Sequence, residues 1–180
     1  QGYADAFYMN KSAFYMATSY YNYGGSPLPL RESLSFSKPD MGSGTNAMIL
    51  NRFALTDTGM TFQAMGSVPG YAINQYSMDE YNGTFRIATT SNDKKTYRPE
   101  NNVFVLDAKS MKILGSVTGL AKNETIQSVR FRGDTGYVVT FENTYPLFVI
   151  DLKDSKNPKV VGELKIPGFS TYLHPYTDKY

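Results

Sequence analysis

Cysteine and tryptophan are absent from this 180-residue sequence, and histidine occurs once, as His174. Without cysteine, the chain forms neither disulfides nor thiolate metal sites. A zinc site needs several histidine or cysteine ligands, which His174 alone cannot supply. The G-x-S-x-G turn of a serine nucleophile is also missing. The sequence therefore indicates no metal, no cofactor and no catalytic residue. His174 is either a binding residue or, more simply, a hydrogen-bonded histidine on an inner strand.

Strong net charge and long apolar runs are missing as well. The formal net charge is +2, which is too small to indicate nucleic acid or a membrane surface as partner. No apolar run approaches the roughly 18 residues that span a bilayer. Hydrophobic residues make up 41% and charged residues 19% of the chain, a globular composition. Because the chain begins at Gln1 rather than at methionine, we expect a processed chain or a segment of a longer one.

Residues 126–168 contain four consecutive strand-like runs. Residues 126–131 alternate apolar and polar side chains, which is typical of a half-buried strand. Residues 137–141 and 147–150 are mostly β-branched or aromatic, as in strands covered on both faces. A fourth run spans 160–166. Short strands joined by polar turns, without a helical period, predict an antiparallel meander.

The same pattern occurs upstream at a regular spacing. Gly66, Gly115 and Gly162 lie 49 and 47 residues apart, and each has apolar residues at the two positions before it. A period of about 40–50 residues with four strands per unit is typical of a β-propeller. We therefore predict an all-β fold, a partial β-propeller of about three four-stranded antiparallel blades plus the first strand of a fourth.

The repeat divides the chain into units without a separate second domain. The predicted blades cover about residues 1–70, 71–119 and 120–168, and residues 169–180 begin the next. In the first blade the strands are expected at 5–9, 13–20, 47–55 and 61–68, with an irregular segment at 21–45. In the second they are expected at 71–80, 85–90, 103–106 and 112–118, with a tight hairpin at Asn82-Gly83. No substantial helix is expected.

Ring closure is the main architectural question. Blades bury their faces against neighbouring blades, and closed rings have roughly four to eight of them. Three blades and one strand are too few, so we expect either the remaining blades of a longer chain or self-association through exposed faces and edges.

Several segments carry a resemblance to a known family. They are residues 68–71, 74–83, 86–90, 128–131, 146–152, 157–159, 162–170 and 173–176. The chain resembles the secreted prokaryotic proteins with a C-terminal β-propeller domain distantly related to WD repeats. The match is best over 64–176, whereas residues 2–54 match only in outline. The resemblance implies a secreted or cell-surface protein with a larger propeller, and it supplies no catalytic residues.

Charged residues on the strands are the first candidates for a binding site. Asp79 and Glu80 are adjacent near a strand end, so they point to opposite faces and cannot form a facing acid–base pair. They could bind a cation or basic ligand, or simply be solvated. Arg86 and Arg130 lie within apolar strands. Buried arginine needs a partner, so we expect ion pairs with carboxylates such as Asp79, or a position facing a central channel.

Tyrosines and aspartates near the loops are the remaining candidates. Tyr20, Tyr21 and Tyr23 flank the long irregular segment. They either contact a protein or glycan partner or pack over the blade. Asp107 and Asp151 each follow an apolar third strand. An Asx-type turn explains them better than a cation site.

Two main functions remain open from the sequence, beside a third, a structural element of the cell envelope. The first is a non-catalytic extracellular interaction or scaffold module that binds a protein or glycan. The alternative is a hydrolase- or lyase-type enzyme with a central-channel site that needs further blades. Propellers host both functions.

Overall fold

Residues 4–21, 46–93, 95–141, 145–166 and 173 are described by the structure, a computed structural model. Their strands form three four-stranded antiparallel sheets, each with its strands in chain order. The first sheet comprises β1 (Ala6–Met9), β2 (Ala13–Tyr21), β3 (Asn46–Thr56) and β4 (Gly59–Pro69). The second comprises β5 (Met78–Tyr81), β6 (Thr84–Asn92), β7 (Pro99–Asp107) and β8 (Ile113–Leu120). The third comprises β9 (Thr125–Arg132), β10 (Thr135–Phe141), β11 (Tyr145–Asp151) and β12 (Lys159–Ile166).

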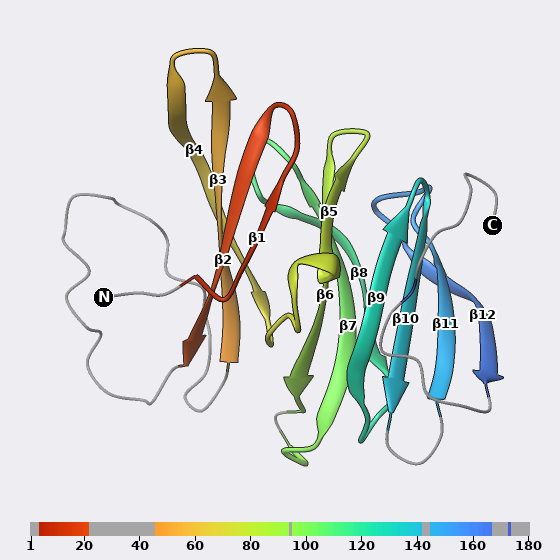
Figure 1. Ribbon diagram of the computed structural model, residues 1–180. Helices are drawn as coiled ribbons and strands as arrows, with labels where there is room; N and C mark the ends of the chain where they lie inside the picture. The colour runs from red at the N-terminus through yellow and green to blue at the C-terminus, as the bar shows by residue number, and fades with distance from the viewer. Residues whose placement is uncertain (1–3, 22–45, 94, 142–144, 167–172, 174–180) are drawn as a thin grey trace.

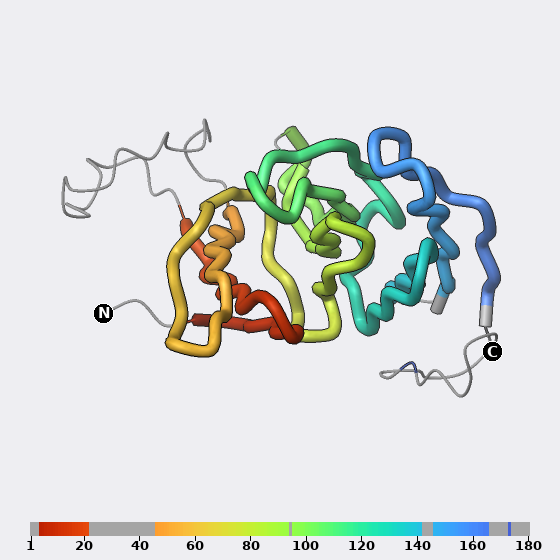
Figure 2. The backbone as a smooth tube through the Cα atoms, turned by 90° about the horizontal axis from the view of Figure 1, so that it is seen from above, coloured from red at the N-terminus to blue at the C-terminus, as the bar shows by residue number. Residues whose placement is uncertain are grey.

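The sheets stand side by side, and the β5–β8 sheet lies between the other two (Figures 1 and 2). This arrangement confirms the predicted all-β, partial-propeller fold. The first strand of a fourth blade was predicted within 169–180, where the structure describes residue 173 alone. The exact division of the chain into blades stays a prediction.

Burial along the second strands shows which faces are covered. Residues 13–18 of β2 alternate between buried and half-buried, whereas residues 85–91 of β6 are buried without interruption. Successive strand residues point to opposite faces. An alternating pattern therefore means one covered face, and a continuous one means two. Within the described part of the chain, the middle sheet is packed on both sides and the first sheet on one.

Two apolar cores fill the spaces between the sheets. The core between the first and second sheets includes Tyr15, Leu50, Phe85, Ile87 and Leu106. The core between the second and third includes Val103, Val105, Val129, Phe148 and Ile150. Burial of such side chains contributes roughly 1.5–3 kcal/mol each, so these two cores hold the three sheets together.

The predicted strand at 71–80 was too long. Residue Tyr71 makes an isolated bridge with Thr90, and a 3-10 turn, η1 (Gln75–Ser77), precedes the short β5. The Asn74 side chain accepts a hydrogen bond from the Tyr76 backbone N–H, which stabilises a turn rather than a strand. Within the described residues, no helix is long and apolar enough to cross a membrane.

The predicted turns are confirmed. Asn82 and Gly83 have φ values of 49° and 75°, so they form the expected two-residue connection between β5 and β6. Asp107 accepts hydrogen bonds from the Ser110 backbone N–H and hydroxyl, both at 2.7 Å. Asp151 accepts one from the Lys153 N–H at 3.0 Å. Both aspartates therefore organise turns.

Glycines on the outer strands allow close approach between sheets. A Cβ added to Gly66 would collide with the Met111 backbone of the next sheet, and one added to Gly115 would lie 2.6 Å from the Ser155 carbonyl oxygen. The predicted alignment of Gly66 with Gly115 and Gly162 is wrong in register. The β-bulges place Ala64 opposite Arg52, at the position that Gly115 and Gly162 occupy in the other sheets. In the first sheet the close contact with the next sheet is made by Gly66, two residues after Ala64.

Candidate binding site at the inner strands

The first strands of the three sheets converge on one side of the molecule. Turn η1 contacts both β1 and β9, and β5 also contacts β9. Three distant parts of the chain therefore meet around the start of the middle sheet. Two of the predicted site residues, Asp79 and Glu80, lie on β5 itself.

Asp79 is paired with Arg86 across the β5–β6 hairpin. The guanidinium donates from Nε to one carboxylate oxygen at 2.6 Å and from Nη2 to the other at 2.5 Å. The Arg86 side chain is only 2% exposed, and that of Asp79 is 22% exposed. This confirms the ion pair predicted for Arg86.

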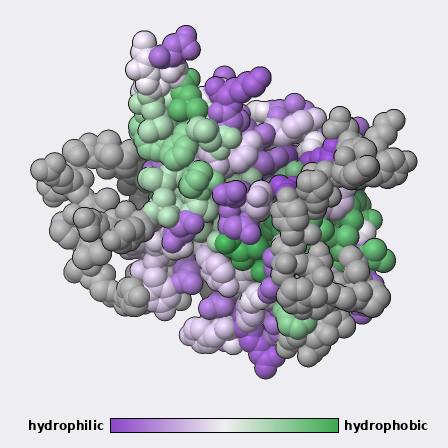
Figure 3. All heavy atoms as spheres, in the orientation of Figure 1, coloured by the Kyte–Doolittle hydropathy of each residue, from purple (hydrophilic) through white to green (hydrophobic). Residues whose placement is uncertain are grey.

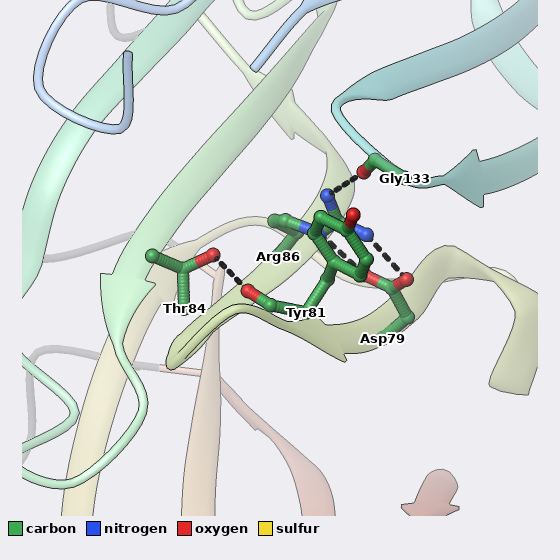
Figure 4. Close-up of polar contacts among 5 residues, drawn as sticks. All are labelled: Asp79, Tyr81, Thr84, Arg86 and Gly133. Atoms are coloured by element: carbon green, nitrogen blue, oxygen red, sulfur yellow. Dashed lines mark hydrogen bonds and ion pairs between the residues drawn. The ribbon is translucent and has the colours of Figure 1, made fainter. Parts of the chain in front are cut away.

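Arg86 also connects the second sheet to the third. Its Nη1 donates to the Gly133 carbonyl oxygen at 2.5 Å, and the guanidinium lies 5.2 Å from the Tyr81 ring and 5.4 Å from the Phe131 ring. Figure 4 shows the guanidinium between the Asp79 carboxylate and the Gly133 carbonyl, with Tyr81 alongside. Because each of these interactions engages a different part of the planar group, Arg86 is fixed in one orientation.

Glu80 points the other way, to the first sheet. Its carboxylate accepts hydrogen bonds from the Tyr15 hydroxyl at 2.5 Å and from Asn10 Nδ2 at 3.0 Å. Arg52 Nε donates to the Tyr15 hydroxyl oxygen at 2.9 Å. The Tyr15 ring stacks on Phe85 at 4.4 Å. Adjacent carboxylates on β5 therefore engage opposite neighbours, as the strand geometry predicted.

Burial raises the pKa of three groups in this region, of which the pocket-lining Tyr8 is one. Burial raises the pKa of Asp79, and the hydrogen bonds and charge of Arg86 oppose that shift without cancelling it. Burial also raises the pKa of the Tyr15 hydroxyl, and its hydrogen bond to Glu80 adds to the effect. Tyr15 therefore stays protonated near neutral pH and serves as a donor to Glu80.

A pocket of about 520 Å³ opens between the inner strands. Strand β1 contributes Phe7, Tyr8 and Met9, η1 contributes Tyr76, β5 contributes Asp79, and β9 contributes Arg130. The volume is within the range of small-molecule and peptide side-chain pockets. The lining combines four aromatic residues, Phe7, Tyr8, Tyr76 and Phe131, with the charged Asp79 and Arg130.

Arg130 differs from Arg86 in its partners. Its guanidinium lies over the Tyr76 ring at 4.4 Å, and Nε donates to the Leu173 carbonyl oxygen at 3.1 Å. Leu173 belongs to the predicted fourth blade, and this contact places Leu173 itself beside the inner strand of the third sheet. Among the described residues its partners include a backbone carbonyl and an aromatic ring, and the ion pair predicted for Arg130 stays a prediction.

The other predicted residues lie elsewhere. Tyr20 and Tyr21 are exposed at the end of β2, by 39% and 43%, and are not part of the pocket lining. Tyr23 and His174 lie outside the described residues. Sequence reasoning missed Tyr15 and Tyr76, although the apolar alternation of β2 places Tyr15 on the covered face. Among the described residues, no group of three potential metal ligands occurs.

The sheets and their radial packing define a propeller, and the comparisons agree. A family model described as "Beta propeller domain" matches residues 1–180, so the chain belongs to that family. An uncharacterized protein of Methanocaldococcus jannaschii is 54% identical over 112 residues, which cover 61% of this chain and 18% of the relative. An uncharacterized protein of Archaeoglobus fulgidus is 51% identical over 112 residues, which cover 62% of this chain and 17% of the relative. The matched stretch spans less than a fifth of each relative.

Proposed function

We propose that this propeller segment is a non-catalytic interaction module of a secreted or cell-surface protein, and that it binds a protein or glycan partner at the inner-strand pocket. The observation that carries the proposal is the combination of an open aromatic lining with charged groups that are already paired within the protein. The extracellular location rests on the family resemblance and belongs to the proposal.

The pairing of the charges argues for binding rather than acid–base chemistry. Both oxygens of Asp79 accept hydrogen bonds from Arg86. A general acid or base must reach the proton that it transfers, and this carboxylate is already engaged by a nearly fully buried guanidinium. A fixed ion pair instead offers a rigid polar edge to a ligand.

The exposed apolar residues supply the contact area. Phe7 is 56% exposed and Met9 is 63% exposed, and both line the pocket. Aromatic side chains present large, stiff surfaces that pack on apolar peptide side chains or on the C–H faces of sugars. Such groups dominate the binding energy of many interfaces.

A direct test compares the chain with a Phe7→Ala/Met9→Ala double variant. Both proteins are immobilised and exposed separately to the protein fraction and the polysaccharide fraction of a prokaryotic cell envelope. We expect one fraction to bind the parent chain, and binding to fall in the double variant. Tyr97→Ala is the control, because Tyr97 is 76% exposed and is not part of the pocket. Absence of binding from both fractions, or equal binding by the double variant, would refute the proposal.

A further inference from the structure

Three tripeptides in the sequence have the acceptor pattern for an N-linked oligosaccharide, asparagine followed two residues later by serine or threonine. They are Asn10-Lys11-Ser12, Asn82-Gly83-Thr84 and Asn123-Glu124-Thr125. The attached sugar is bulky and hydrophilic, so it requires an asparagine at the surface. The three asparagines differ in what their side chains do in the folded chain.

The Asn10 side chain is part of the contact between the first two sheets. Its Nδ2 donates to the Glu80 carboxylate at 3.0 Å. Its Oδ1 accepts hydrogen bonds from the backbone N–H groups of Ser12 and Ala13, both at 2.9 Å. A sugar on Nδ2 would compete with the bond to Glu80, so Asn10 has a structural role.

Asn123 is held against the start of β7. Its backbone N–H donates to the Pro99 carbonyl oxygen at 2.8 Å, and its Oδ1 accepts from Arg98 Nη1 at 3.3 Å. The residue is half-buried, and the next residue, Glu124, accepts a hydrogen bond from the Thr140 hydroxyl. This second tripeptide is therefore packed between the middle and third sheets.

Asn82 lies at the tip of the β5–β6 hairpin. Tyr81, Asn82 and Gly83 are all exposed, and a Cβ added to Gly83 would meet nothing within 4 Å. Figure 1 shows the turn at the upper end of the hairpin, and Figure 3 shows hydrophilic residues at the upper ends of the β1–β2 and β5–β6 hairpins. The middle sheet has a described sheet on each side (Figure 2), and the turn is exposed in the presence of both.

The threonine of the same tripeptide also belongs to this turn. The Thr84 hydroxyl donates to the Tyr81 carbonyl oxygen at 2.7 Å (Figure 4). The Asn82 amide and the Thr84 hydroxyl are therefore on one surface turn, outside the residues that line the inner-strand pocket. Of the three tripeptides, this is the one that accommodates a large hydrophilic group without loss of a contact between sheets.

We propose that Asn82 is the attachment site of an N-linked oligosaccharide. The proposal rests on the extracellular location within the proposed function, because this modification is typical of secreted proteins. The donor is an oligosaccharide linked to a lipid phosphate. Asn82 Nδ2 forms a bond to the anomeric carbon of the sugar as the bond from that carbon to the phosphate oxygen breaks. The amide loses one proton to water, and the lipid phosphate leaves.

Peptide mapping by mass spectrometry tests the site. The chain is exported, with an acceptor tag fused after Tyr180, from an archaeal host that modifies this tag. We expect Asn82 to carry a mass addition of whole sugar residues. Asn82→Asp, which tolerates the positive φ of the turn, and Thr84→Ala should both lose the addition completely. Thr84→Ser keeps the acceptor pattern and should retain it, as should the matched control Asn123→Asp.

An exported chain that is modified in the tag but not at Asn82 would overturn the proposal, and so would an addition at Asn82 that persists in Thr84→Ala. Circular dichroism verifies that each variant remains folded. Pocket binding is measured on chain without sugar and at different residues. Absence of the sugar therefore leaves the proposed binding function standing, and absence of pocket binding leaves the attachment site standing.

Discussion

Asp79 and Glu80 are neighbours on β5, yet their interactions connect β5 to different sheets. Asp79 fixes Arg86, which reaches the Gly133 carbonyl oxygen of the third sheet. Glu80 accepts a hydrogen bond from Tyr15 of the first sheet. Because strand side chains alternate between faces, one short strand supplies a polar anchor to both of its neighbours. The inner strand of the middle sheet is therefore the polar centre of the described structure.

Breaking the Arg86 ion pair is expected to be costly. Arg86→Ala leaves the largely buried Asp79 carboxylate without its partner, and loss of one member of such a pair costs about 3–5 kcal/mol. An Arg86→Met/Asp79→Asn double variant removes both charges and is expected to lose less. Urea unfolding measures the free energies. A larger loss in the double variant than in Arg86→Ala would contradict this explanation.

The raised pKa of Asp79 predicts a particular dependence of stability on pH. A folded-state pKa above the ordinary 3.8 means that the folded state binds the proton more tightly than the unfolded state. The contribution of Asp79 is therefore full below pH 3.8 and is lost as pH rises through the folded-state pKa. Compared with Asp79→Asn, the parent chain should lose free energy of unfolding across that window. A relative gain with rising pH would show that the attraction of Arg86 dominates.

Removal of the Tyr15 hydroxyl tests the contact with the first sheet. Tyr15→Phe keeps the stack on Phe85 but deprives Glu80 and Arg52 of their shared partner. We expect a loss of about 1–3 kcal/mol in the free energy of unfolding. Tyr137→Phe is the matched control, because Tyr137 pairs with Val149 in the third sheet as Tyr15 pairs with Arg52 in the first, and it should change stability by about 0.5 kcal/mol or less. Equal effects would show that the hydrogen bonds to Glu80 and Arg52 contribute little.

Two glycines on outer strands should differ in their tolerance of a methyl group. In Gly115→Ala the new Cβ would lie 2.7 Å from the Lys156 carbonyl oxygen, whereas in Gly162→Ala the nearest atom outside the chain neighbours is 3.6 Å away. Overpacking of this kind costs about 1–3 kcal/mol. The midpoint temperature of thermal unfolding should therefore be clearly lower for Gly115→Ala than for Gly162→Ala. The reverse order would contradict the sheet packing.

The sheets were predictable because their signals are local. Alternating and β-branched runs and the Asn82-Gly83 turn indicate which segments form strands, whereas the repeated glycines gave the wrong register for the first sheet. The 71–80 prediction failed because Asn74 stabilises a turn through a side-chain hydrogen bond, which the apolar pattern does not reveal.

The contacts between sheets were harder to predict. Arg86 was expected to pair with a carboxylate because burial of a lone guanidinium is unfavourable, and that argument needs no coordinates. The Tyr15–Glu80 contact depends on how two sheets pack, and the equivalent positions carry chemically different residues, Tyr15 and Arg86. The pocket likewise depends on convergence of β1, η1 and β9, which no single stretch of sequence encodes.

Double-mutant cycles on the free energy of unfolding test most directly whether β5 anchors two interfaces separately. Removal of Tyr15 and Glu80, singly and together, should give a coupling of about 0.5–3 kcal/mol, as should removal of Arg86 and Asp79. The cycle between Tyr15 and Arg86 should give a coupling close to zero, because these side chains act on opposite faces. Strong coupling between Tyr15 and Arg86, or none within either pair, would contradict the account.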